Sequence, residues 1–354
     1  MTKAELDNRK VLPLEDSWYR RVKEKLDGIA KPLDGLGKFE HLIAQIGAIE
    51  KTTKISIQKK AVLVMCADNG VVEEQVSQSG KEVTLAVAKA MGVNNSSVGK
   101  MAAVAGVDVI PVDIGIDTDE VIPGVLSRKV TKGTKNFARE PAMTEEEVLK
   151  AIETGIQLVQ QCHRDGYEIL ATGEMGIGNT TTSTAVAAAL LDLEVEQVTG
   201  KGAGLTDEAL KRKCRVIEEA IEKYSLRDAD AFTILKTVGG LDIAGLTGVF
   251  IGAAIEQIPV VIDGVISAVA ALLAETLCKG TVNYMIPSHK SRELAETAIM
   301  KKLHLDPVLD ADMALGEGTG AVMMMSLLDV ALGVYLKGAS FANFEIEQYK
   351  RYEE

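Results

Sequence analysis

Short apolar runs alternate along this chain with longer segments that repeat apolar residues every three or four positions. The short runs are rich in β-branched residues and nearly free of polar side chains, as parallel strands covered on both faces must be. The alternation predicts an α/β fold with an open, mostly parallel, Rossmann-like sheet and flanking helices. The predicted strands are Lys60 to Ala67, Val107 to Ile114, Glu168 to Thr172, Ile234 to Val238, Pro259 to Ile262 and Val282 to Ile286.

The two ends of the chain carry helical patterns. Residues 14–28, 38–50 and 319–336 place apolar residues at three- and four-residue spacing, and the last segment is long and mostly apolar. This spacing predicts a helix in each of them. The charged tail, residues 345–354, is expected to be frayed and solvated.

The most apolar stretch, residues 258–273, does not predict a membrane span. Asp263 and Gly264 interrupt it, and it is shorter than the roughly 20 residues that cross a bilayer. A buried strand followed by a buried helix fits this pattern better. Residues 1–7 are polar and acidic, which indicates neither a signal peptide nor a transit peptide and favours the cytoplasm.

Composition limits the classes of partner. With 354 residues, 47% of them hydrophobic, the chain can bury one large core and a smaller appendage. The net charge of −12 and the lack of a basic cluster argue against nucleic acid as a partner. The cysteines lack the spacing of a zinc site, so we expect reduced thiols and no metal. They are Cys66, Cys162, Cys214 and Cys278.

Polar residues and glycines collect directly after the predicted strands. In open α/β sheets, ligands bind in the crevice at the carboxyl ends of the strands, where the strand order reverses. Acidic residues follow five of the six strands, which is more than turns require, so we predict one active site there. The segments are Asp68-Asn69-Gly70, Asp113-Ile114-Gly115, Gly173-Glu174, Gly239-Gly240-Leu241-Asp242, Asp263-Gly264 and Ser288-His289.

The stretch Ala314-Leu315-Gly316-Glu317-Gly318-Thr319-Gly320-Ala321 places one carboxylate between glycines, ahead of an apolar helix. Glycines let the backbone approach a ligand closely, and Glu317 is the only side chain there that can move a proton. This pattern is typical of a catalytic base. A solvated glutamate at a helix N-terminus is the alternative that spacing alone leaves open.

Residues 171–184 read Ala-Thr-Gly-Glu-Met-Gly-Ile-Gly-Asn-Thr-Thr-Thr-Ser-Thr and predict a strand, a glycine loop and a helix. The backbone amides of such a loop, with the positive end of the following helix, can bind a phosphate or another anion. The alternative is an ordinary strand-to-helix turn, capped by Asn179 or Thr180.

Two common nucleotide-binding motifs are missing. Residues 199–204 resemble a P-loop superficially, but no glycine stands five residues before Gly200 and no Ser or Thr follows Lys201. Neither Gly176-Ile177-Gly178 nor Gly316-Glu317-Gly318 continues to the third glycine of a dinucleotide fingerprint. A Walker ATPase is disfavoured, and a nicotinamide-dependent oxidoreductase is a weak alternative.

Five ordered motifs span nearly the whole chain and together resemble the nicotinate-nucleotide:dimethylbenzimidazole phosphoribosyltransferase family, which makes the lower-ligand nucleotide of cobamides. The resemblance implies a dimer in which residues 55–310 form a large α/β domain with the active site. Residues 1–54 and 311–354 would form a small helical domain, and no cofactor is expected. The motifs are Lys31-Pro32-Leu33-Asp34-Gly35-Leu36-Gly37, Ala67-Asp68-Asn69-Gly70-Val71, Gly173-Glu174-Met175-Gly176-Ile177-Gly178-Asn179-Thr180-Thr181, Val238-Gly239-Gly240-Leu241-Asp242 and Leu315-Gly316-Glu317-Gly318.

The implied reaction displaces nicotinate from nicotinate mononucleotide by an aromatic base, with inversion from a β donor to an α-linked product. Glu317 would take the proton of the acceptor. Glu174 would lie near the ribose and oppose the developing oxocarbenium charge, or would instead anchor neighbouring backbone amides. Residues 259–264 contain one acid, Asp263, where enzymes that use phosphoribosyl pyrophosphate usually need paired carboxylates, which agrees with a monophosphate donor.

For the donor phosphate the resemblance points to five residues. Lys213 has an alternative as a solvated member of the basic stretch 211–215. Ser291 has an alternative as a helix cap. The five are Gly176, Gly202, Lys213, Gly264 and Ser291.

The acceptor pocket departs from the family pattern. Many relatives have Tyr-Pro where this chain has Ser79-Gly80, a His at Asn69, and a Gln where it has Ala86-Val87. Lost aromatic and polar contacts alter the selection of a benzimidazole, so a purine or phenolic acceptor stays open. The expected acceptor contacts are Ser79, Met175 and Leu315.

A second class of function is a noncatalytic paralogue that serves as the partner subunit of an active relative in a heterodimer. The presence of both Glu317 and Glu174 argues against it, since folding demands neither. A catalytic homodimer is therefore the favoured expectation.

Overall fold

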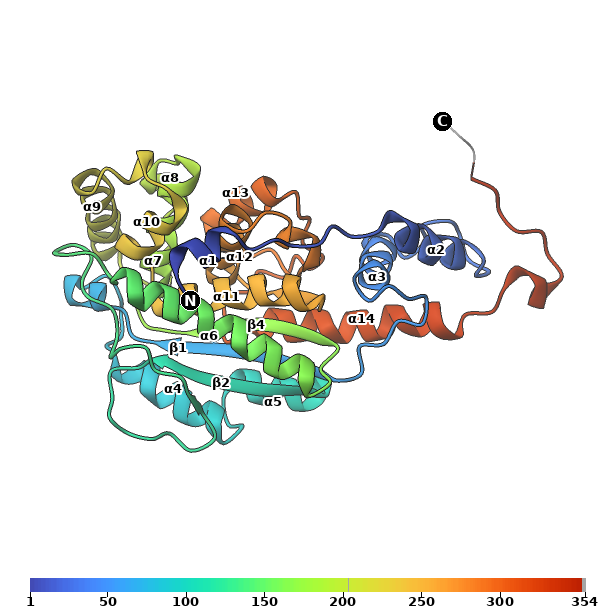
Figure 1. The fold of residues 1–354 in the computed structure, drawn as a ribbon, viewed down its shortest axis with the longest axis horizontal. Helices are drawn as coiled ribbons and strands as arrows, with labels where there is room; N and C mark the ends of the chain where they lie inside the picture. Colours follow the sequence, from blue (N-terminus) through green and yellow to red (C-terminus); the bar gives the residue numbers. More distant parts are fainter. Residues whose placement is uncertain (203, 352–354) are drawn as a thin grey trace.

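Among residues 1–202 and 204–351, which the computed structural model describes, six strands form one parallel sheet (Figure 1). Their order, β3-β2-β1-β4-β5-β6, is that of a doubly wound sheet whose strand order reverses between β1 and β4. The predicted fold class is confirmed. The strands are β1 (Lys60–Ala67), β2 (Val107–Gly115), β3 (Leu126–Ser127), β4 (Ile169–Met175), β5 (Val260–Ile262) and β6 (Met285–Pro287).

Helices alternate with these strands and enclose the sheet (Figure 1). The α-helices are α1 (Lys3–Asp7), α2 (Asp16–Asp27), α3 (Lys38–Ile49), α4 (Glu82–Gly92), α5 (Ser97–Ala105), α6 (Glu145–Arg164), α7 (Asn179–Leu191), α8 (Val195–Val198), α9 (Asp207–Lys223), α10 (Ala231–Val238), α11 (Leu241–Glu256), α12 (Val265–Leu277), α13 (Leu294–Leu303) and α14 (Thr319–Lys337). The 3-10 helices are η1 (Gly70–Glu74), η2 (Leu226–Asp228), η3 (Thr281–Tyr284) and η4 (Phe341–Phe344).

The central strand β1 is buried on both faces because its side chains alternate between two cores. Leu63 and Met65 pack on the side of α6, α7, α11 and α12. Val64 and Cys66 pack on the opposite side, with α3, α4, α5 and α14. This explains why the strand is apolar throughout after Lys60, and it leaves the carboxyl ends of the strands as the edge available for a site.

Two predicted strands are wrong in part or in whole. Residues 234–238 belong to helix α10, because Asp230 caps its N-terminus by accepting the Thr233 amide at 3.0 Å and its apolar residues share one buried face. In residues 282–286, η3 replaces the first part of the strand, since the Glu275 carboxylate accepts the Val282 amide at 3.0 Å and holds a turn there. The other predicted strands and the three predicted terminal helices are confirmed within a few residues.

Helix α14 is long and apolar enough to cross a membrane by length and composition, with a mean hydropathy of 1.7 over its central window. It packs against α5, β4 and β5, and 56% of that window is buried inside the molecule. These contacts are those of a core helix, and its first turn adjoins the carboxyl ends of the strands.

The helices α2 and α3 pack against each other beside α14 and the amino ends of the strands (Figure 1). Helix α1 lies elsewhere, because Leu6 enters the core that contains α6. The boundaries of the two expected domains stay a prediction.

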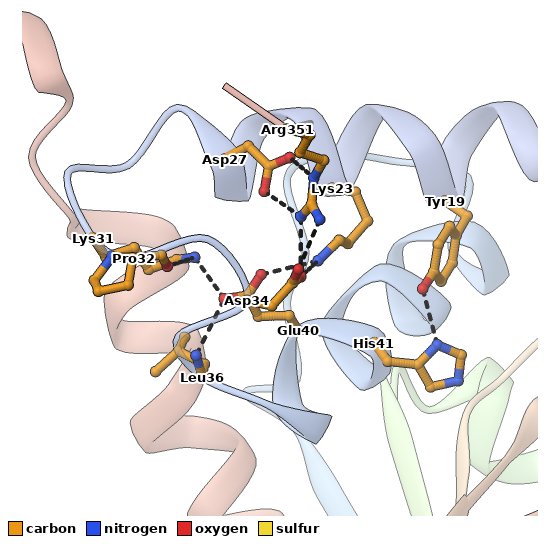
Figure 2. Close-up of polar contacts among 10 residues, drawn as sticks. All are labelled: Tyr19, Lys23, Asp27, Lys31, Pro32, Asp34, Leu36, Glu40, His41 and Arg351. Carbon is orange, nitrogen blue, oxygen red and sulfur yellow. Dashed lines mark hydrogen bonds and ion pairs between the residues drawn. The ribbon is translucent and has the colours of Figure 1, made fainter. Parts of the chain in front are cut away.

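The Lys31–Gly37 motif lies in an ion-pair network between α2, α3 and the C-terminal tail (Figure 2). Glu40 is almost fully buried and accepts from Lys23 at 3.0 Å and Lys31 at 2.5 Å. Arg351 pairs with Asp27 and Asp34, each at 2.7 Å. The tail to residue 351 is therefore exposed but anchored rather than frayed, and residues 352–354 lie outside the described residues.

Replacing Glu40 by glutamine is expected to destabilise the fold by about 3 kcal/mol, because the largely buried Lys31 would lose its ion-pair partner and Lys23 would keep only Asp34. Burial raises the pKa of Glu40, but the hydrogen bonds from Lys31 and Lys23 outweigh it and lower the pKa. The contribution should therefore be complete above the ordinary value of 4.5 and be lost as the pH falls through the folded-state pKa. Urea unfolding at several pH values measures both effects.

The matched control is Asp306→Asn, which removes a carboxylate from an exposed pair with Lys38. Its effect should stay below about 1 kcal/mol. Equal losses in the two variants would contradict the proposed contribution of the buried network.

Candidate active site

A cavity of about 300 Å³ opens at the carboxyl ends of β4, β5 and β6. Eight of the ten predicted site residues line it, and they come from five separate segments. Lys213 lies directly behind its wall, whereas Ser79 is half-buried and does not line it. The eight are Glu174, Met175, Gly176, Gly202, Gly264, Ser291, Leu315 and Glu317.

Glu317 stands in a strained loop. Gly316, Glu317 and Gly318 have φ angles of +83°, +60° and +89°, a left-handed run that costs a non-glycine residue on the order of 1 kcal/mol or more. The Oε2 atom of Glu317 accepts the Val98 amide at the N-terminus of α5, at 3.0 Å. This bond orients the carboxylate and leaves its other oxygen as a possible proton acceptor in the cavity.

Two glycines allow this loop to lie against the sheet. A Cβ atom at Gly173 would stand 2.6 Å from the carbonyl oxygen of Glu317. One at Gly318 would stand 2.6 Å from a methyl group of Val62. The glycines on β4 and in the loop are therefore what brings Glu317 beside Glu174.

Asp263 binds the backbone at the start of α14. Its Oδ1 accepts the amides of Gly320 at 2.8 Å and Ala321 at 3.1 Å, and its Oδ2 accepts the Gly318 amide at 3.1 Å. Burial raises the pKa of Asp263, while the nearby His289 and these amides oppose the rise. Asp263 thus acts as a positioning residue for the Glu317 loop.

Glu174 is buried in a carboxylate pair. The Asn179 side-chain amide donates to Glu174 and to Asp242, the latter at 3.0 Å. Burial, followed by repulsion from Asp242, raises the pKa of Glu174 to about 8. Burial likewise raises the pKa of Asp242 to about 6. A cation beside this pair would lower both pKa values, so this end of the cavity suits a positive charge.

The opposite end of the cavity suits an anion. Lys213 is fully buried, in contrast to Lys211 and Arg215 on the same helix, so the alternative of a solvated side chain does not hold for it. Its ammonium donates to Thr180 Oγ1 at 3.0 Å and to the Gly200 carbonyl at 3.2 Å. Burial lowers the pKa of Lys213 to about 8. An added anion would favour its charged form.

Apolar side chains form the wall near Glu317. Met175 and Leu315 lie there as predicted, together with Val87 and Ile177. Asn69, one of the departures from the family pattern, is fully buried behind the wall and donates to the Ile177 carbonyl at 3.3 Å. It therefore supports the wall from behind without lining the cavity.

Comparisons with known proteins agree on one assignment. A family model described as phosphoribosyltransferase matches residues 11–346. The nicotinate-nucleotide–dimethylbenzimidazole phosphoribosyltransferase of Clostridium acetobutylicum is 43% identical over 337 residues, covering 95% of this chain and 96% of the relative. That of Acetivibrio thermocellus is 44% identical, covering 93% and 94%. The chain belongs to this phosphoribosyltransferase family.

The fold agrees with that of a solved family member. The crystal structure of the same-named enzyme from Thermus thermophilus superimposes with a TM-score of 0.88 at 33% identity, covering 95% of this chain and all of that one. Because the superposition covers nearly the whole chain, the similarity to this phosphoribosyltransferase extends beyond the sequence motifs to the fold.

Sequence reasoning missed several residues of this phosphoribosyltransferase cavity. Asn179 and Asp263 lie in segments that the sequence marks out, but their contacts with Glu174 and with the Glu317 loop were not predicted. Val87 was noted as a departure from the family pattern but not as a wall residue, and Glu293 gave no signal, because its place in the wall depends on how the segment before α13 packs.

Replacing Glu174 by glutamine is expected to raise thermal stability increasingly with pH. The pKa of Glu174 is about 8 in the folded protein, above the ordinary value of 4.5. As the pH rises between these two values, Glu174 loses its proton in the unfolded chain but keeps it in the fold, so the wild-type fold becomes progressively less stable. The glutamine variant lacks this loss, so its unfolding midpoint should exceed that of the wild type by a few degrees above pH 8 and by little near pH 5.

Thermal unfolding followed by circular dichroism across this pH range measures the difference. The exposed Glu222→Gln serves as control and should show no such trend. A Glu174→Gln variant whose midpoint difference is flat with pH would show that Glu174 ionises normally in the fold.

Proposed function

We propose that this phosphoribosyltransferase moves the phosphoribosyl group of nicotinate mononucleotide to 5,6-dimethylbenzimidazole or a closely related aromatic base, releasing nicotinate and giving an α-ribotide. The observation that carries the proposal is the division of one cavity into three parts. Lys213 and glycine amides lie at one end, buried carboxylates lie at the other, and Glu317 stands beside these carboxylates and an apolar wall. These parts match a phosphate, a cationic ribosyl centre and an aromatic acceptor.

The donor phosphate would bind the amides of Gly176, Gly202, Gly264 and Ser291 and the ammonium of Lys213. Such backbone amides and a buried cation are the usual phosphate ligands of α/β folds. This places the ribose and the cationic nicotinate ring toward Glu174. The positive charge there would lower the raised pKa of Glu174 and favour its carboxylate form when the donor is bound.

In the reaction, the unprotonated ring nitrogen of the acceptor attacks the anomeric carbon from the face opposite nicotinate. The bond from that carbon to the nicotinate nitrogen breaks, and its electron pair returns to the pyridine ring. Glu317 accepts the proton from the other ring nitrogen of the acceptor, so no positive charge stays on the product. Glu174 opposes the oxocarbenium charge of the transition state.

The acceptor would lie between Met175, Leu315 and Val87, whose side chains offer apolar contact to its ring. The names of the relatives favour dimethylbenzimidazole over the purine and phenolic alternatives, and they favour a catalytic chain over a noncatalytic subunit. The predicted contact from Ser79 needs a movement of residues 77–80 toward the cavity.

A homodimer and a cytoplasmic location are further parts of the proposal. The four cysteines are free thiols, which suits a reducing compartment. Sedimentation of the purified chain tests the oligomeric state. A monomer that gains activity only with a paralogue would favour the heterodimer instead.

The test of the proposed function is an acceptor panel. The protein is incubated with nicotinate mononucleotide and, separately, with dimethylbenzimidazole, adenine and a phenol, and nicotinate release is followed by chromatography. We expect release with dimethylbenzimidazole at the highest kcat/KM. Release with none of the acceptors would contradict the function, and release with a phenol alone would overturn the choice of acceptor.

A further inference from the structure

Two of the backbone amides assigned to the donor phosphate already bind carboxylates of this chain. The Gly202 amide donates to Glu293 Oε1 at 3.2 Å. The Ser291 amide donates to Glu296 Oε2. Both carboxylates come from the segment that begins α13, so one short element supplies anions to two positions of the phosphate subsite.

Glu293 lies deeper in this subsite than a single hydrogen bond suggests. A Cβ atom at Gly200 would stand 2.0 Å from Glu293 Oε2, so the carboxylate lies directly against the glycine loop. Burial lowers the pKa of Lys213, the buried cation of the subsite, and the nearby Glu293 carboxylate opposes that lowering. A carboxylate on a loop amide beside a buried ammonium has the same partners that a phosphate would take.

The Glu293 side chain has few other contacts that would hold it in the subsite. It precedes α13 with an extended backbone and makes no side-chain capping bond to that helix. Its side chain is half-buried, and it lines the cavity. Glu296 differs, because it is almost fully buried and supports the Ser291 backbone from beneath.

We propose that the Glu293 carboxylate is an internal anion that occupies the donor-phosphate subsite and is displaced when the donor phosphate binds. The inference rests on the proposed function for the identity of that subsite. A phosphate dianion offers enough charge and oxygen atoms to replace Glu293 on the Gly202 amide and to bind the Lys213 ammonium as well. A nucleoside without a phosphate would leave Glu293 in place, so the cost of displacing Glu293 falls only on ligands that carry the phosphate.

The test compares the wild-type protein with Glu293→Gln by calorimetric titration of inorganic phosphate and of nicotinate mononucleotide. Removing the competing charge should lower the Kd of both ligands by about tenfold, which corresponds to about 1.4 kcal/mol. Glu293→Ala, which also vacates the Gly202 amide, should show at least the same gain. Asp310→Asn is the matched control, since it removes an exposed carboxylate beside Lys290 that contacts no part of the subsite, and it should leave both Kd values unchanged.

Unchanged or weaker phosphate binding in both Glu293 variants would overturn the inference, because Glu293 would then be a bystander or a ligand of the donor. The proposed function fails separately, when nicotinate mononucleotide does not bind the wild-type protein and no acceptor releases nicotinate. An equal gain in Asp310→Asn would also contradict the inference, since the effect would be one of net charge.

Discussion

Glu317→Gln is expected to lower kcat by a factor on the order of 100 or more, with little change in the affinity for nicotinate mononucleotide. The glutamine amide keeps the shape of the side chain and an oxygen that can accept the Val98 amide, so the loop should hold its position. It cannot accept the proton of the attacking base, and the product would have to form with a positive charge. Steady-state kinetics and a donor titration measure the two quantities.

Glu275→Gln is the matched control. Glu275 also accepts backbone amides, those of Gly280 and Val282, but it lies outside the cavity. Its replacement should leave kcat unchanged. Near-normal turnover in Glu317→Gln, or an equal loss in the control, would show that the carboxylate at 317 serves the loop rather than the chemistry.

Lys213→Met is expected to raise the Kd of nicotinate mononucleotide by roughly 10- to 100-fold, the value of one charge-assisted contact to a phosphate. The methionine fills a similar volume in a fully buried position, so the fold should tolerate it. The loss should be seen for inorganic phosphate as well, because the contact is to the phosphate and not to the ring. Calorimetric titration of both ligands measures it.

The exposed Lys211→Met on the same helix is the control, and it should bind both ligands normally. Because the buried Lys213 ammonium donates to a hydroxyl and a carbonyl and forms no ion pair among the described residues, thermal unfolding of Lys213→Met should show no loss of stability. Normal phosphate binding in a folded Lys213→Met would remove Lys213 from the donor site.

The elements that could be predicted from the sequence are those whose local pattern decides their structure. The bounds of β1 agree with the prediction because the strand is buried on both faces and its sequence is therefore apolar at nearly every position. All eight of its residues are buried, as expected of an inner strand of a parallel sheet. The run at 234–238 was equally apolar but short, and such a run does not distinguish a buried strand from a buried helix. The Asp230 cap before it was the available signal for a helix.

The same distinction applies to the site. Glu174 and Glu317 could be predicted because glycines beside them mark close backbone approach, and the structure shows that approach at Gly173 and Gly318. The burial of Lys213 could not be predicted, since its neighbours on α9 have the same charge and only packing against Thr180 distinguishes it. Glu293 lies in an ordinary charged turn, and its contact with Gly202 arises from chain segments about ninety residues apart.

The most direct test of the account is a crystal structure of the protein with nicotinate mononucleotide bound. We expect the phosphate to bind the Lys213 ammonium and four backbone amides, those of Gly176, Gly202, Gly264 and Ser291. We also expect the ribose beside Glu174 and an open apolar space between the anomeric carbon and Glu317. A donor bound outside this cavity, or bound with its phosphate toward Glu317, would contradict the assignment of the site.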